Sequence, residues 1–186
     1  MFLSTFAMDV ANGFITDITS VCDRIEIVGS LRRQREIVHD IDILVIPRFA
    51  EVHDASLFGG KLQVNLLDAQ VKQLHTAGRL AVERNGPRMK TLCLECDTDH
   101  ISIDLYVATP ATWWTLLLIR TGSRVHNIWL AAMAAERKMQ LKADGSGIID
   151  PNGQLLQIHS EEEIFEILGI PYVAPASRNR PPSAQH

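Results

Sequence analysis

The sequence predicts an α/β (α+β) fold, in which a domain of strands and helices is followed by a smaller α+β domain. Three runs rich in apolar and β-branched residues indicate strands, at residues 40–46, 89–95 and 101–107. Segments with a helical spacing of apolar residues accompany them. Pro110 then opens a stretch of different character. We therefore expect one domain at residues 1–110 and a second at residues 111–186.

Local patterns predict the elements of the first domain. Apolar residues recur four apart at Phe6, Val10, Phe14 and Ile18, which favours a helix over about residues 3–20. The other elements expected here are, in order, a strand at 24–28, a helical turn or two at 31–37, a loop at 48–60 and a helix at 62–77.

The second domain is expected to begin with two helices. They are predicted at residues 111–120 and 125–137, with Thr121-Gly122-Ser123 between them. A small hairpin or three-stranded sheet is predicted from residues 148–149 and 155–158. Ser160 and Glu163 form a capping box for a last helix that ends at Gly169. The tail is expected to be disordered from about residue 176.

Composition excludes several classes of protein. The 186 residues are 46% hydrophobic and 22% charged, which is globular composition. A net charge of -4 argues against tight, non-specific binding of nucleic acid. The longest uncharged run, residues 105–119, is shorter than the roughly 20 residues of a membrane-spanning helix, so no membrane partner is expected. Three cysteines do not suit a secreted disulfide scaffold, which favours an intracellular, cytoplasmic protein.

Three aspartates carry the clearest chemical signal. Asp40 and Asp42 lie two apart on a predicted strand, so their carboxylates project from the same face. Carboxylates this close repel each other unless a cation lies between them, and their hard oxygens suit Mg²⁺. Asp104 lies between apolar residues of another predicted strand, which is costly unless it faces a cation or the open end of the sheet.

The segment before these aspartates has the features of a phosphate site. Gly29 lets the backbone approach a ligand, Ser30 offers a hydroxyl donor and Arg33 a permanently charged clamp. His39 either contacts phosphate or merely ends the strand. A lone pair of strand carboxylates is more often a solvated surface, and Gly-Ser after a strand is more often a plain turn. The phosphate-binding residues nevertheless lie about a dozen residues before the metal-binding carboxylates, and metal-assisted phosphoryl or nucleotidyl transfer requires both kinds of group.

These motifs together resemble the family X DNA polymerases. GSLRR followed by HDIDILV resembles their nucleotidyltransferase core, and ISIDLYV resembles the strand of their third catalytic aspartate. TGSRVHN is similar to their nucleotide-selection motif, while ERKMQL and SEEEIFEILGIPY resemble their C-terminal domain. The resemblance implies a polymerase-beta-like nucleotidyltransferase palm with a small C-terminal α+β nucleotide-selection domain. A palm followed only by a C-terminal domain resembles the reduced form found among viral members of the family. The resemblance therefore leaves open that the protein is encoded by a virus or phage and acts in an infected cell.

The resemblance also implies roles for individual residues. It implies that two Mg²⁺ ions, which Mn²⁺ could replace, are held by Asp40, Asp42 and Asp104, and that Asp104 helps to activate the primer 3′-hydroxyl. It further implies that the incoming nucleotide is bound by Gly29, Ser30, Arg33, His39, Gly122, Ser123 and Asn127. Arg32, next to the phosphate clamp Arg33, is expected to face a different direction from Arg33 and to contribute more to DNA binding than to nucleotide binding.

The expected function is Mg²⁺-dependent addition of deoxynucleotides to a DNA primer, in gap-filling repair synthesis. The expected partners are gapped or primer–template DNA and deoxynucleoside triphosphates. The acidic pI of about 5.9 leaves room for a protein partner that supplies DNA affinity. Two alternatives stay open: template-independent transfer to a DNA, RNA or protein acceptor, and a non-catalytic scaffold subunit. The family's aromatic pair before TGS is replaced by Ile119 and Arg120, which leaves sugar selection open.

Overall fold

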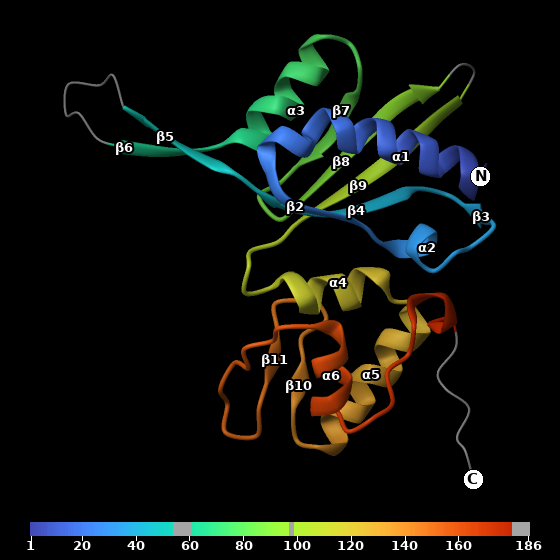
Figure 1. Cartoon of the computed structure of the whole chain (residues 1–186), viewed down its shortest axis with the longest axis vertical. Helices are drawn as coiled ribbons and strands as arrows, with labels where there is room; N and C mark the ends of the chain where they lie inside the picture. The colour runs from blue at the N-terminus through green and yellow to red at the C-terminus, as the bar shows by residue number, and fades with distance from the viewer. Residues whose placement is uncertain (54–60, 97–98, 180–186) are drawn as a thin grey trace.

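The computed structural model describes residues 1–53, 61–96 and 99–179 as two lobes (Figure 1). The sheet lobe is built on a five-stranded sheet in the order β2-β4-β9-β8-β7. Its strands are β2 (Cys22–Ile27), β4 (Ile41–Pro47), β9 (Asp99–Val107), β8 (Met89–Cys96) and β7 (Ala81–Asn85). The helical lobe contains α4 (Trp113–Thr121), α5 (Arg124–Glu136) and α6 (Glu161–Ile167). No helix in the described ranges is long and apolar enough to cross a membrane.

The centre of the sheet is a parallel pair, β4 and β9, and the other neighbouring strands are antiparallel. Residues alternate between the two faces of a strand. Ile41, Ile43 and Val45 of β4 therefore face one core, while Leu44 and Asp42 face the other side. Apolar residues on both faces explain why these two strands read as continuous hydrophobic runs in the sequence.

Two helices cover the first face of the sheet, α1 (Ser4–Ile18) and α3 (Leu66–Thr76) (Figure 1). Phe14 and Ile18 of α1 and Leu67 of α3 are buried there. The helix predicted at 62–77 begins only at Leu66, because the residues before it pair in a strand, β6 (Lys61–Asn65). The Asn65 side chain caps α3 by accepting the Leu67 backbone N–H at 3.0 Å.

Several short elements differ from the sequence prediction. Part of the predicted loop at 48–60 is a strand, β5 (Phe49–His53), which pairs with β6 in an arm that projects from the sheet (Figure 1). Residues 54–60 of that loop lie outside the described ranges. The predicted turn at 31–37 is replaced by α2 (Gly29–Arg32) and β3 (Ile37–Val38), which pairs with β1 (Phe2–Leu3). Strand β7 was not predicted. The short 3-10 helix η1 (Thr19–Val21) ends α1.

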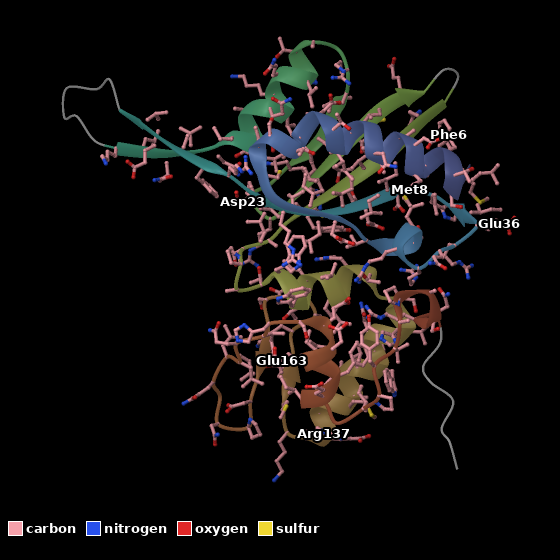
Figure 2. The ribbon with its side chains drawn as sticks, in the orientation of Figure 1. Phe6, Met8, Asp23, Glu36, Arg137 and Glu163 are labelled. Atoms are coloured by element: carbon pink, nitrogen blue, oxygen red, sulfur yellow. The ribbon has the colours of Figure 1, made fainter. Side chains whose placement is uncertain are left out.

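The helical lobe matches its predicted helices closely. A two-stranded sheet joins β10 (Gln140–Leu141) to β11 (Ile148–Ile149), and Ile149 also forms a bridge with Leu155. The Ser160 hydroxyl accepts the Glu163 backbone N–H at 3.0 Å, which confirms the predicted cap of α6. Glu163, labelled in the helical lobe in Figure 2, in turn accepts the His159 backbone N–H.

Helix α4 packs on the second face of the sheet and joins the two lobes (Figure 1). Trp113 and Leu117 of α4 share a buried cluster with Leu44 and Tyr106. Arg24 of β2 adds cation–π contacts, with its guanidinium carbon 4.3 Å from the ring centroids of both Trp113 and Trp114. The face of the sheet that carries Asp42 therefore looks towards the helical lobe.

A buried ion network forms the second link between the lobes. Glu161, 3% exposed at the start of α6, accepts hydrogen bonds from Arg32 of α2 at 2.6 and 3.1 Å. It also accepts one at 2.6 Å from Arg178, which is fully buried. Arg32 therefore faces elsewhere than the phosphate clamp, as expected, and its guanidinium is held by Glu161 and the Thr121 hydroxyl. Its expected role in binding DNA stays a prediction.

The same network corrects the prediction for the tail. Residues 175–177 form a 3-10 turn, η2 (Pro175–Ser177), and Arg178 behind it is anchored by Glu161 and by the Val173 carbonyl oxygen. The chain is therefore anchored at Arg178, beyond the expected start of disorder at about residue 176. The buried ion pair between Arg178 and Glu161 holds this segment in place. The prediction failed because it was based on the small and polar residues of the segment, and composition does not show such a distant contact.

Replacing Glu161 with Ala should destabilise the protein strongly, because Arg178 would be left as an uncompensated buried charge. We expect the free energy of unfolding to fall by about 3–5 kcal/mol. Glu162→Ala, at an exposed neighbouring position of the same helix, is the matched control and should change it by less than about 0.5 kcal/mol. Guanidinium unfolding followed by circular dichroism measures both. Equal, small losses in the two variants would contradict a stabilising role for the network.

Candidate active site

Two carboxylates from the central strands meet at the face that looks towards the helical lobe. Asp42 of β4 and Asp104 of β9 are direct partners in the parallel register. Each is flanked along its strand by buried apolar residues that point to the opposite face. The strand alternation, rather than the open end of the sheet, thus allows an aspartate in the middle of an apolar strand.

Two hydroxyl groups bind these carboxylates. Tyr106 Oη donates to Asp42 Oδ1 at 3.2 Å and lies 3.5 Å from Asp104 Oδ2, so it bridges the pair. Thr91 Oγ1 of β8 donates to Asp104 Oδ1 at 2.9 Å. Neither residue was singled out from the sequence. The available signal was the spacing, since Tyr106 lies two residues after Asp104 and therefore on the same face of β9.

Asp42 is a buried carboxylate among other negative charges. Burial, together with the nearby charges of Asp40 and Asp104, raises the pKa of Asp42 from 3.8 to about 7. The hydrogen bond from Tyr106 and the charge of Arg33 oppose that rise in pKa. A cation placed beside Asp42 would relieve both the repulsion and the cost of burial.

The prediction that Asp40 and Asp42 lie on one strand is wrong, because Asp40 precedes the strand. Strand β4 begins at Ile41, so Asp40 occupies the bend before the strand and is half-buried. Within the described ranges, no three His, Cys, Asp or Glu side chains are close enough to form a ready-made metal cluster. The strand register brings Asp42 and Asp104 together, while the charge of Asp40 raises the pKa of Asp42. The hard oxygens of this pair fit a cation such as Mg²⁺.

Gly29 and Ser30 pass directly beside Asp42. Gly29 has a φ of 61°, and a Cβ atom there would lie 1.8 Å from Asp42 Oδ2. Only glycine leaves room for the Asp42 carboxylate. This close approach explains why glycine occupies position 29 better than a plain turn does. The Ser30 hydroxyl is buried without a hydrogen-bond partner among the described residues. Unpartnered buried hydroxyl groups are rare, and this one is free to bind a ligand.

Arg33 reaches across to the helical lobe. Its Nη1 donates to the Thr121 carbonyl oxygen, and its Nε donates to Asn179 Oδ1 at 3.3 Å. The same side chain lines a pocket of about 450 Å³ between the lobes. Arg33 is therefore both a contact between the lobes and a cation that faces the pocket.

The pocket gathers the predicted nucleotide-selection residues. It is lined by Arg33, Ile119, Arg120, Gly122, Ser123, Arg124, Asn127, Ile128, Ala131, Leu141 and Ala143. Three arginines and no acid line it, so it favours an anionic ligand. Gly122 ends α4 with a φ of 40°, which glycine permits, and Asn127 Nδ2 donates to the Ile119 carbonyl oxygen at 2.8 Å. Asn127 Oδ1 and Arg120 Nε are buried without partners among the described residues.

The remaining predicted site residues have less distinctive surroundings. His39 is exposed between β3 and β4 and does not line this pocket. Ser123 caps α5, and its hydroxyl donates to the Arg178 carbonyl oxygen at 2.7 Å. The residue therefore has a structural role in addition to lining the pocket. Of the neighbouring Arg32, Arg33 and Arg35, the first two are held in place by the helical lobe, while Arg35 is exposed.

Comparison with known proteins places this geometry in context. Residues 116–179 match the family model of the DNA polymerase beta thumb. The chain is 27% identical over 165 residues to DNA polymerase lambda of Rattus norvegicus, covering 81% of this chain and 28% of the relative. It is 29% identical over 150 residues to the DNA polymerase/3′-5′ exonuclease PolX of Bacillus subtilis (81% and 23%). It is 28% identical over 180 residues to DNA nucleotidylexotransferase of Gallus gallus (83% and 35%).

Solved structures share the fold. The ternary P/T complex of Leishmania infantum polymerase beta aligns with a TM-score of 0.77 at 18% identity, over 96% of this chain and 76% of that one. Its ternary gap complex aligns with the same TM-score at 17% identity, over 96% of this chain and 70% of that one. The predicted fold class is confirmed. The chain spans about a quarter to a third of the length of the curated relatives it matches.

Replacing Gly29 with Ala should destabilise the protein more than Gly78→Ala does. Both glycines have a left-handed φ, of 61° and 69°, but a Cβ at Gly78 meets no atom within 4 Å. The backbone cost of about 1–2 kcal/mol is shared by the two variants, and only Gly29→Ala adds the clash with Asp42. Chemical unfolding of the two variants measures the difference. Equal losses would show that Asp42 moves aside at no cost.

His126 supplies a prediction about pH. Its ring is fully buried in α5, packs against Trp129 and Phe165, and has no hydrogen-bond partner among the described residues. Burial, with the nearby Arg178 cation, lowers the pKa of His126 from 6.5 to about 4, while Glu161 opposes this shift.

Because the folded state disfavours protonated His126, stability should be unaffected by this group above about pH 6.5 and should fall as the pH drops from 6.5 towards 4. His126→Phe keeps the ring and removes the titration, so its stability should fall less over that interval. Thermal unfolding at a series of pH values compares the two proteins. Parallel curves would contradict the assignment.

Proposed function

The chain is a relative of the family X DNA polymerases, and from that premise we propose that it transfers deoxynucleotides from their triphosphates to the 3′-hydroxyl of a DNA primer. The observation that carries this proposal is the pairing of Asp42 and Asp104 in register, beside the Gly29-Ser30 turn. A pocket lined by three arginines and no acid lies at the same junction of the lobes. Metal-binding carboxylates next to an anion pocket are the parts that nucleotidyl transfer needs.

The metal ions belong to this proposal. Asp42 and Asp104, with Asp40 completing the set, would hold two Mg²⁺ ions, which Mn²⁺ can replace. When bound, such ions lower the pKa of the attacking hydroxyl and neutralise the charge of the leaving pyrophosphate. The pairing of Asp42 with Asp104 and the repulsion on the buried Asp42 carboxylate support this assignment.

The chain's own residues bind and orient the nucleotide. The Ser30 hydroxyl, which lacks a partner, and the Arg33 guanidinium bind the terminal phosphates. Gly122, Ser123 and Asn127 lie along the sugar and base, where the Asn127 Oδ1 acceptor is available. His39, exposed at the start of the catalytic strand, contacts phosphate or DNA.

The proposed DNA substrate is a primer–template with a short gap, and the proposed role is repair synthesis. Two similar structures are the ternary P/T and gap complexes of Leishmania infantum polymerase beta, which supports such a substrate here. Arg32 and Arg33 are held in the link between the lobes, so few cations of this segment are left to bind DNA. The affinity for DNA should therefore be modest, and a protein partner would add to it.

Template-independent transfer is the second candidate. It is favoured by the 28% identity to a DNA nucleotidylexotransferase over 180 residues. A non-catalytic scaffold is disfavoured, because such a protein has no use for carboxylates held together in a buried sheet at a cost in repulsion. Primer extension on the same labelled strand, with and without a template, distinguishes the two enzymatic candidates.

Asp104→Asn should abolish nucleotide addition while leaving the fold intact. The amide keeps the shape and removes one charge from a repelling pair, so unfolding should change little. Because metal ions at the reacting oxygens stabilise the transition state directly, we expect the rate to fall by at least about a thousandfold. Asp9→Asn, at an exposed position of α1, is the control and should retain full activity. Retention of a tenth of the rate by Asp104→Asn would remove Asp104 from the mechanism.

A further inference from the structure

A chain of contacts links the anion pocket to the carboxylate pair. Arg120, in the last turn of α4, lines the pocket and places its guanidinium carbon 4.3 Å from the centroid of the Tyr106 ring. Tyr106 is 8% exposed, and its hydroxyl bridges Asp42 and Asp104 at 3.2 and 3.5 Å. One aromatic ring therefore touches the helical lobe with its face and both carboxylates with its hydroxyl.

We propose that Tyr106 is a positioning residue that holds Asp42 and Asp104 in the geometry that binds a divalent ion, and that Arg120 acts through it by fixing the ring. This proposal rests on the proposed function, since it concerns the same metal site. It adds two residues that the sequence motifs did not identify as part of that site.

The hydroxyl can remain in place when an ion binds. A carboxylate oxygen has two lone pairs, so Asp42 Oδ1 can accept the Tyr106 hydrogen bond and still coordinate a metal. Hydrogen bonds to ligating carboxylates fix their orientation, and their loss typically weakens metal binding about 10–100-fold. Thr91, which donates to Asp104 Oδ1 at 2.9 Å, supports the second carboxylate in the same way.

Arg120 is suited to hold the ring. A guanidinium over the face of a tyrosine is attracted by the ring quadrupole, and Arg120 makes no hydrogen bond through its buried Nε to the described residues. The contact with the Tyr106 ring connects Arg120 to the sheet lobe. Since Arg120 also lines the pocket, its replacement would disturb nucleotide binding as well, so catalytic activity alone cannot test the proposal.

Binding of Mn²⁺, measured without nucleotide or DNA by electron paramagnetic resonance of the free ion, provides the test. Tyr106→Phe should raise the Kd for Mn²⁺ about tenfold, because only the hydroxyl is lost. Arg120→Gln should raise the Kd about three- to fivefold, as expected for a lost cation–π contact. The double variant should bind no more weakly than Tyr106→Phe alone, because Arg120 acts through Tyr106. Arg120→Lys, which keeps the charge, should largely restore the affinity.

The controls separate this proposal from the proposed function. Arg124→Gln removes another arginine of the same pocket and should leave the Kd unchanged, and thermal unfolding should show that every variant is folded. If Asp104→Asn abolishes Mn²⁺ binding while Tyr106→Phe binds normally or more tightly, the positioning role is wrong and the metal site stands. Additive effects in the double variant would also overturn the role of Arg120. If the unsubstituted chain binds no Mn²⁺, the metal site itself is wrong and this proposal falls with it.

Discussion

The parallel register of β4 and β9 is the constraint around which the candidate site is arranged. It sets Asp42 directly opposite Asp104 on a buried face, where two negative charges repel each other and lose hydration. The surroundings answer that constraint. Gly29 leaves space for Asp42, and Tyr106 and Thr91 donate to the carboxylates. What these neighbours do not supply is a full positive charge at the carboxylate oxygens, and a divalent ion would provide it.

The short segment that follows Gly29 also determines how the two lobes meet. Arg32 is bound by Glu161, and Arg33 donates to the Thr121 carbonyl oxygen, so one turn of helix beside the carboxylates holds the helical lobe against the sheet. The anion pocket is lined from both sides of this junction. Changes at Glu161 should therefore alter the pocket as well as stability, although Glu161 does not line it.

The fold and the strands that carry Asp42 and Asp104 were largely predictable from the sequence, because both depend on local patterns. The apolar runs around Asp42 and Asp104 indicated buried strands, and the Ser160 cap marked the start of α6. The elements that were missed depend on partners distant in the chain. Strand β7 is mostly exposed and lacks an apolar run, and Lys61–Asn65 is a strand because β5 pairs with it. Glu161 belongs to an acidic run typical of a solvated surface, so nothing local showed that two arginines would bury it.

The departures from the family motif have a physical explanation in the packing. The sequence places Ile119 and Arg120 where an aromatic pair usually precedes TGS, which by itself suggests a weakened site. In the structure an aromatic ring lies next to Arg120, but it belongs to Tyr106 of β9. The helical lobe thus contributes the cation and the sheet contributes the ring. The same ring places its hydroxyl on the carboxylate pair. Residue-by-residue comparison with a motif cannot detect this contact, since Arg120 and Tyr106 belong to different motifs and meet only in the folded chain.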